Sequence, residues 1–95
     1  MKKIQMLLSI IKMHQSLEFT STIVNKKPNS GNYNLEAVHS LGDGQVTYES
    51  TNPEVATVDN NGEVTILSNG TTNIVASASE TEQYFPVSAS YTLNV

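Results

Sequence analysis

The chain has 95 residues, a net charge of −4 and no cysteine. A chain of this length forms one domain with a single core, and the lack of cysteine excludes disulfides, thiol catalysis and thiolate metal sites. Only five residues are Lys or Arg, and four of them lie within the first 26 positions. Because no basic patch crosses the body of the chain, we expect no binding to nucleic acid.

Residues 1–15 differ from the rest of the chain. Two lysines precede an apolar run from Ile4 to Ile11, as in a secretory signal, but Lys12 interrupts the run and no small-x-small cleavage motif follows. Apolar residues also recur there at helical spacing, so a short docked helix and a membrane or partner anchor stay open as alternatives. The run is too short to span a membrane, which takes about 20 residues. We expect a signal-like or weakly helical tail over residues 1–15, outside the fold, and one domain over residues 16–95.

From residue 16 onward, apolar and polar residues alternate with a period of two, which is typical of half-buried strands. The alternating stretches span residues 17–23, 32–40, 45–50, 54–58, 63–67, 71–79 and 88–95. Clusters of Gly, Asn, Asp and Pro between them predict turns. We therefore predict an all-β, immunoglobulin-like Greek-key β-sandwich of about seven strands, which is the usual number for a domain of this size.

The same alternation predicts which side chains fill the core. In the first stretch Leu17, Phe19 and Ile23 fall on one face, and in the third Tyr48 is expected as the central core ring. A slip of one residue in any strand would turn its apolar face outward, so these predictions also specify the register. The largest share of stability is expected from Val55, Val58, Val64, Ile74 and Leu93.

Residues 46–95 carry a pattern that is more specific than alternation. An aromatic residue is followed by Ser-x-Asn-Pro and Val-Ala-Thr-Val-Asp, then by a glycine turn, a valine, a second glycine, a Thr-x-Ile strand and a final alternating strand. The pattern comprises Tyr48, Ser50, Asn52, Pro53, Val55 to Asp59, Gly62, Val64, Gly70, Thr72, Ile74 and Tyr91 to Val95. It resembles the group 2 bacterial Ig-like domains, a family of intimin- and invasin-type surface modules. Residues 17–45 fit more loosely, Tyr48 stands where the family usually has Trp, and nothing matches residues 1–15.

This resemblance implies a setting as well as a fold. Such domains are modules of secreted or surface-anchored bacterial and phage proteins, where they act as spacers or adhesive units. The resemblance therefore implies an extracellular or bacterial cell-surface location. It also implies partners among the neighbouring domains of a larger surface protein, or a host or cell-surface protein or glycan. The family brings no catalytic residue and no cofactor to this chain, and we expect the module to be a monomer.

The oxygen-rich stretch at residues 59–63, Asp-Asn-Asn-Gly-Glu, is the first candidate site. Ca²⁺ takes six to eight oxygen ligands, but the glutamate that ends an EF-hand loop is replaced here by Gly70. The Asn-Gly step suits the positive φ of a tight hairpin, and Asp59 can accept bonds from nearby backbone N–H groups. We interpret the stretch as a turn and predict neither a metal site nor catalysis by Asp59 and Glu63.

The remaining candidates are two histidines and an aromatic pair. His14 and His39 lie on separate elements without a third ligand at metal spacing, so no zinc site is predicted. Tyr84 and Phe85 precede the last strand and could stack on a sugar ring. Large aromatic residues are more often buried than displayed, so we favour a lid over the open end of the sandwich. A ligand-binding role for Tyr84 and Phe85 stays open as the alternative.

These observations predict a non-catalytic extracellular Ig-like module that serves as a spacer or adhesion domain of a bacterial surface or secreted protein. Two alternatives stay open, namely a carbohydrate-binding module and an accessory domain of a secreted polysaccharide-degrading enzyme. No catalytic residue, cofactor or metal ligand is predicted, and the folded domain is not expected to insert into a membrane.

Overall fold

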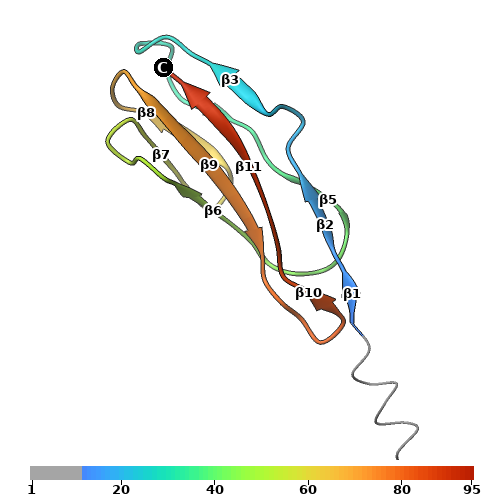
Figure 1. The fold of residues 1–95 in the computed structure, drawn as a ribbon. Helices are drawn as coiled ribbons and strands as arrows, with labels where there is room; N and C mark the ends of the chain where they lie inside the picture. The colour runs from blue at the N-terminus through green and yellow to red at the C-terminus, as the bar shows by residue number, and fades with distance from the viewer. Residues whose placement is uncertain (1–11) are drawn as a thin grey trace, which may run out of the picture.

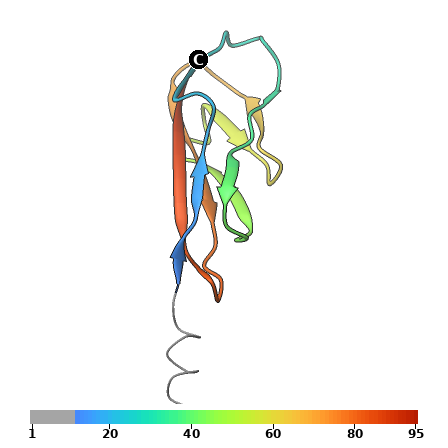
Figure 2. The ribbon, with the colours of Figure 1, turned by 90° about the vertical axis from the view of Figure 1, so that its right-hand side faces the viewer.

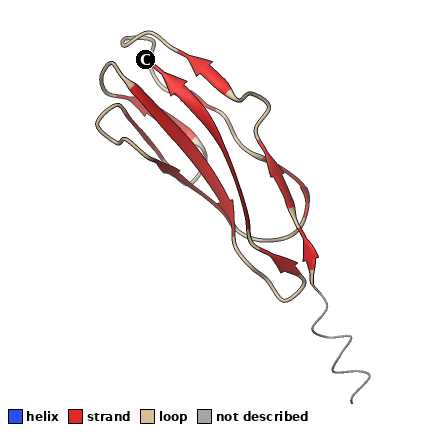
Figure 3. Cartoon of the chain, in the orientation of Figure 1, coloured by secondary structure: helices blue, strands red, loops and turns tan. Residues whose placement is uncertain are grey.

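The computed structural model describes residues 12–95, and within this range the chain forms strands and loops without a helix (Figure 3). Figure 1 shows the strands as arrows along an elongated sandwich. In chain order they are β1 (Met13–His14), β2 (Ser16–Glu18), β3 (Ile23–Asn25), β4 (Tyr33–Asn34), β5 (Val38–Leu41), β6 (Val46–Ser50), β7 (Ala56–Val58), β8 (Glu63–Ile66), β9 (Thr71–Ala78), β10 (Tyr84–Phe85) and β11 (Val87–Asn94).

The strands form two layers. One layer is a four-stranded sheet in the order β3-β11-β9-β6. The other layer contains the three-stranded sheet β4-β8-β7 and the two-stranded sheet β2-β5. The chain connects these two sheets directly, because β5 follows β4. Figure 2 shows β11 on one side of the sandwich and the green-to-yellow strands of the second layer on the other. This two-layer arrangement is that of an immunoglobulin-like sandwich, so the predicted fold class is confirmed.

The two longest strands, β9 and β11, supply half of the buried hydrophobic residues of the core. They pair antiparallel over eight positions, from Val87 opposite Ala78 to Asn94 opposite Thr71. Along β9 the buried residues fall at every second position, as a strand with one face on the core requires. They are Thr72, Ile74, Ala76 and Ala78. The alternation that predicted these strands therefore also gave the correct inward face.

The central aromatic residue of the core is Tyr91, and the prediction of Tyr48 for this place is wrong. Tyr91 is 2% exposed, and Phe19 packs against it edge to face with 4.7 Å between ring centroids. Tyr48 is half-buried and packs against the margin of this cluster. The difference follows from topology, because β11 lies between two strands whereas β6 is the edge of its sheet.

Four of the five residues predicted to stabilise the core are buried. Val55, Val64, Ile74 and Leu93 are each at most 4% exposed. Val58 is only half-buried at the margin of the core. It lies on β7, which is an edge strand with a neighbour on one side only. We therefore expect Val58 to contribute less free energy of unfolding than the other four.

Ile23 was predicted on the inward face with Leu17 and Phe19, and this prediction is wrong. Ile23 is 60% exposed, whereas Leu17 and Phe19 are buried. The alternating stretch is not one strand, because β2 pairs with β5 in one layer and β3 pairs with β11 in the other. As the chain crosses between layers the phase of the alternation changes, and the neighbouring Val24 packs against the core instead.

The predicted tail falls largely on residues 1–11, which lie outside the described residues. The first described residues, 12–15, are part of the sandwich. Met13–His14 form β1, and Gln15 is 4% exposed. Residues 13 and 14 are held by the pairing of β1 with β10, and the division of the chain into a tail and a domain stays a prediction.

Candidate functional site

The aromatic pair Tyr84 and Phe85 forms β10 at the end of the sandwich where β1 enters. β10 pairs in parallel with β1, with Met13 opposite Tyr84 and His14 opposite Phe85. The turn before β10 is held by Thr81, whose Oγ1 accepts a bond from the Tyr84 N–H at 3.1 Å. We call this end, formed by β1, β10 and the loops at residues 42–45 and 79–83, the N-terminal pole.

The two aromatic side chains do not form a joint platform. Adjacent residues of a strand point to opposite faces, and here Tyr84 is half-buried while Phe85 is 40% exposed. The ring centroids of Phe85 and His14 are 5.1 Å apart, and the Lys12 ammonium lies 5.8 Å from the centroid of the Phe85 ring. Lys12 also forms an ion pair with Glu80. Sugar binding by this pair stays a prediction, and a ligand that stacks on both rings at once does not fit their placement.

The polar centre of the pole is the side chain of Gln15. Its Nε2 donates hydrogen bonds to the carbonyl oxygens of Ser79 (2.9 Å) and Phe85 (2.8 Å). Its Oε1 accepts from the Gly44 N–H at 3.2 Å and lies 2.8 Å from His39 Nε2. The amide orientation is fixed, because two carbonyl oxygens can be satisfied only by the NH₂ group. One side chain, directly after β1, thus joins β5, β10 and the two loops of the pole.

Two glycines make room for Gln15. A side chain at Gly44 would collide with the Ser79 carbonyl, and one at Gly42 would collide with the Cβ of Gln15 itself. The glycines of the Gly-Asp-Gly stretch at residues 42–44 were predicted only as a chain reversal. The sequence did not predict the role of Gln15, because periodicity does not distinguish one buried amide from many exposed ones. The available signal was the pair of glycines at 42 and 44, which permits another part of the chain to approach the backbone closely.

The stretch at residues 59–63 is a tight turn in the structure. Asp59 Oδ1 accepts bonds from the backbone N–H groups of Asn61 (2.9 Å) and Glu63 (3.0 Å). Gly62 has a φ of +83°, which glycine adopts at little cost. This geometry matches the interpretation of Asp59 as a residue that fixes the hairpin between β7 and β8. Its oxygen Oδ1 is engaged by the turn itself.

The histidines serve as packing and hydrogen-bonding partners within the pole. His14 stacks on Phe85, and His39 bonds to Gln15. Within residues 12–95 no three His, Cys, Asp or Glu side chains come together in a way that could hold a metal ion. None of the buried side-chain polar atoms in this part of the chain lacks a hydrogen-bond partner.

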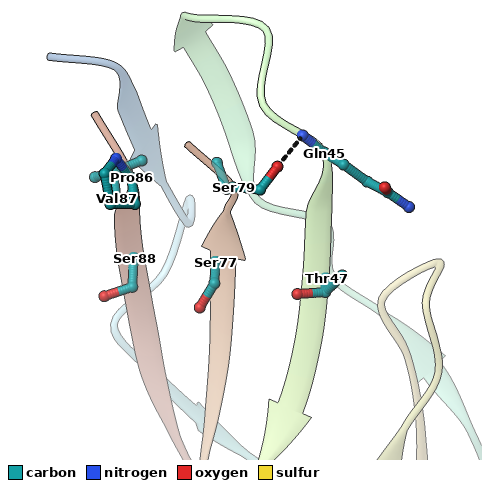
Figure 4. Close-up of a pocket in the computed structure, with 8 residues that line it drawn as sticks. Gln45, Thr47, Ser77, Ser79, Pro86, Val87 and Ser88 are labelled. Carbon is teal, nitrogen blue, oxygen red and sulfur yellow. Dashed lines mark hydrogen bonds between the residues drawn. The ribbon is translucent and has the colours of Figure 1, made fainter. Parts of the chain in front are cut away.

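A shallow hollow lies on the outer face of the four-stranded sheet, close to the pole. Figure 4 shows Thr47, Ser77 and Ser88 in a row across β6, β9 and β11, with Gln45 and Ser79 above them. Their register places Thr47 and Ser88 on either side of Ser77. The Ser79 hydroxyl accepts a bond from the Gln45 N–H at 3.1 Å. The lining has no titratable side chain, so it holds no general acid or base.

A pair of tyrosines has perturbed pKa values inside the sandwich. The hydroxyls of Tyr33 and Tyr91 are 2.8 Å apart. Burial raises the pKa of Tyr91 far above its usual range, and the hydrogen bond to Tyr33 raises it further. Burial also raises the pKa of Tyr33. Both groups therefore stay neutral at physiological pH and act as structural hydrogen-bonding partners.

Across residues 12–95 there is no helical segment with the length and apolar character needed to span a bilayer.

Comparison with known protein families agrees with the strand topology. Residues 34–80 match the family model described as the intimin immunoglobulin-like domain. Over this segment the chain is similar to bacterial Ig-like domains of the intimin type. The matched segment begins at the end of β4 and extends just past β9, so it includes the hairpin at Asp59 and the buried face of β9. A search of curated proteins gives no match.

The match confirms the resemblance found in the sequence at the level of an intimin- or invasin-type module. Modules of this type are generally non-catalytic adhesion domains of bacterial surface proteins. The similarity points to a surface-adhesion type of Ig-like module for this chain.

Proposed function

We propose that this intimin-type module is a force-bearing extracellular spacer or adhesion domain of a larger bacterial surface protein, and that it is a monomer without catalytic activity. Two observations support the non-catalytic part. The hollow lacks titratable groups, and one carboxylate oxygen of Asp59, Oδ1, is engaged by its own turn. The spacer part is supported by the way in which the two ends of the described chain are held.

The chain enters at one end of the sandwich and leaves at the other. Figure 1 shows β1 at the lower end and the C-terminus at the upper end. Tension on a tandem array of such modules therefore acts along the long axis of the sandwich. The strands β3 and β11 also run along this axis (Figure 1).

The single observation that carries the proposal is the parallel pairing of β3 with β11. Ile23, Val24 and Asn25 lie opposite Thr92, Leu93 and Asn94. Backbone bonds connect Thr92 N–H to the Thr22 carbonyl and Lys26 N–H to the Asn94 carbonyl, each at 2.9 Å. Because the strands are parallel and residues 12 and 95 lie at opposite ends of the sandwich, tension applied there moves β3 and β11 in opposite directions along their axes. The bonds are then loaded together in shear rather than one after another.

The second parallel pair, β1 with β10, lies directly at the entry point. The Met13 N–H donates to the Gln83 carbonyl at 2.8 Å, and Gln15 bonds to the Phe85 carbonyl. Tension on residue 12 loads this pair in shear as well. Both terminal segments of the described chain thus have attachments that resist an axial force.

Single-molecule force spectroscopy of the module between identical handle domains tests this proposal. Val24→Pro removes an N–H that faces β11, whereas Asn25→Pro removes one that faces away from it. We expect Val24→Pro to lower the unfolding force clearly more than Asn25→Pro. Equal forces for the two variants would contradict the force-bearing role. The non-catalytic claim is tested separately, because turnover of a polysaccharide by the isolated module would contradict it.

The carbohydrate alternative has its own test. Titration of the ¹⁵N-labelled module with oligosaccharides reports binding through shifts of amides at residues 79–86. We expect no such shifts for ligands that need both Tyr84 and Phe85, because these side chains belong to opposite faces of β10. Clustered shifts in that segment would favour sugar binding over the spacer role.

A further inference from the structure

Strand β6 forms an edge of the four-stranded sheet, and within residues 12–95 its only strand partner is β9 (Figure 1). The pairing runs without a register shift from Val46 to Ser50. Two flanking backbone bonds, from Ser79 N–H to the Gln45 carbonyl and from Thr51 N–H to the Asn73 carbonyl, are each 3.0 Å long. These bonds fix which backbone groups of β6 face β9.

Antiparallel pairs alternate between those that exchange hydrogen bonds and those that do not. With residues 45 and 51 bonded to the β9 side, residues 47 and 49 are bonded to it as well. Val46, Tyr48 and Ser50 therefore direct their backbone N–H and C=O groups away from the sheet. None of these backbone groups has a hydrogen-bond partner in the described part of the chain. The edge is a row of donors and acceptors ready for another strand.

The other sheet edges are less suited to such pairing. Among the other edge strands β1, β4 and β10 have two residues each, β2, β3 and β7 have three and β5 has four, whereas β6 has five. The pairing of β2 has an irregularity, and β3 is followed at once by Lys-Lys-Pro. Bulges, lysines and prolines at edges are devices that block addition of a further strand. β6 has none of these, and its only charged residue is Glu49.

The charge distribution indicates the chemistry of the partner. All five Lys and Arg residues lie before residue 28, and of the nine Asp and Glu residues only Glu18 does, so residues 28–95 carry eight carboxylates and no Lys or Arg. Glu49 is exposed on the strand itself. A second copy of the chain carries the same net charge of −4, which disfavours self-pairing. A cationic segment complements this surface.

We propose that the free edge of β6 binds an extended segment of a partner protein that carries Lys or Arg at alternate positions, by β-strand addition. The added strand bonds to the outward N–H and C=O groups of Val46, Tyr48 and Ser50. Its cationic side chains lie on the outer face beside Thr47 and Glu49, and the intervening side chains face the margin of the core beside Tyr48. The interface uses groups that the spacer role leaves free.

A capped heptapeptide of alternating Lys and Val is the probe, and the same peptide with Glu in place of Lys is the control. The readouts are amide shifts of the ¹⁵N-labelled module and hydrogen exchange of its backbone amides. We expect the Lys peptide to shift the amides of Val46, Tyr48 and Ser50 and to slow their exchange. The Glu peptide should leave them unchanged.

A pair of variants tests the hydrogen-bonding mode. Val46→Pro removes an outward N–H at the first residue of the strand, where proline is tolerated, and Val46→Ala makes a comparable loss of side-chain packing while keeping the N–H. We expect Val46→Pro to bind the Lys peptide roughly three- to tenfold more weakly than Val46→Ala. This factor corresponds to the loss of about one hydrogen bond.

Three outcomes would overturn the proposal. One is the absence of shifts on β6 at about 1 mM Lys peptide, which bounds the affinity below a useful level. Another is an equal response to the Lys and Glu peptides. The third is concentration-dependent shifts on β6 without any peptide, which would make a second copy of the chain the occupant. The two peptides are compared on the unaltered chain, so this comparison stands even if Val46→Pro does not fold.

Discussion

The N-terminal pole and the middle of the sandwich are held together by different kinds of interaction. In the middle, Phe19, Ile74, Tyr91 and Leu93 form an apolar cluster in which each side chain is at most 9% exposed. At the pole, a single amide, Gln15, joins four elements through hydrogen bonds in fixed directions. Packing depends on volume, whereas hydrogen bonds depend on which atom donates. The stability of the middle should therefore be most sensitive to a loss of side-chain volume. The stability of the pole should be most sensitive to a change of the hydrogen-bonding atoms at nearly constant volume.

The largest effect is expected from a loss of volume in the middle. Leu93 is fully buried on β11, so Leu93→Ala leaves a cavity that the two sheets cannot close. We expect the free energy of unfolding to fall by about 3–4 kcal/mol. Chemical denaturation followed by fluorescence of the tyrosines measures it. A loss below about 1 kcal/mol would show that the cluster is not the main source of stability.

The second effect is a change of charge at almost constant volume. Gln15→Glu places carboxylate oxygens against the carbonyl oxygens of Ser79 and Phe85, and we expect a loss of about 2–3 kcal/mol at pH 7. The two carbonyls raise the pKa of the introduced carboxyl in the folded state. The loss should therefore shrink as the pH falls through that raised pKa, because the protonated carboxyl can donate one bond. Denaturation curves at pH 4 to 8 measure this.

Gln15→Leu is the control for that experiment. It removes the amide without adding a charge, so its loss of stability should not depend on pH over the same interval. If the stability of the Glu and Leu variants had the same pH dependence, the stability of the pole would not depend on which atoms of the Gln15 amide donate and accept hydrogen bonds.

A smaller effect is expected at the turn. Asp59→Ala removes the acceptor of two backbone N–H groups at an exposed site, and we expect a loss of about 1 kcal/mol. Asp59→Asn keeps the side-chain carbonyl oxygen and should cost clearly less. Thermal unfolding followed by circular dichroism compares the two. A similar loss for both variants would mean that the charge, and not the hydrogen bonds, stabilises the turn.

The smallest effect separates the centre of the core from its margin. Val58 is half-buried on the edge strand β7, so Val58→Ala should cost about 0.5–1 kcal/mol. Equilibrium unfolding in urea, run beside Leu93→Ala, provides the comparison. A loss as large as that of Leu93→Ala would place Val58 in the centre of the packing.

The sequence predicted the two-layer fold because an alternating pattern on β9 and β11 specifies which face is buried. The interpretation of Asp59 rested on local turn chemistry, which also acts within a few residues. Ile23 was misplaced because the crossing between layers after Phe19 has no local signal in the pattern. The same limit applied to Tyr48 and Tyr91, since only the order of strands in the sheet decides which ring is central.

The pole was the part that could not be predicted. Its bonds join Gln15 to residues that are distant along the chain, such as Ser79 and Phe85. The parallel pairs β1–β10 and β3–β11 are equally non-local, and alternation does not reveal the direction of a neighbouring strand. The proposed response to force depends on these pairs and therefore came from the structure alone.

The most direct test of the force-bearing account is the dependence of the unfolding force on the direction of pulling. The chain has no cysteine, so a single one at position 29 gives a unique attachment in the loop that follows β3. Pulling between this site and the C-terminus separates β3 and β11 from one end and breaks their bonds in succession. Pulling between the two chain ends loads the same bonds together. We predict a markedly larger unfolding force for the end-to-end direction, and equal forces in both directions would contradict the account.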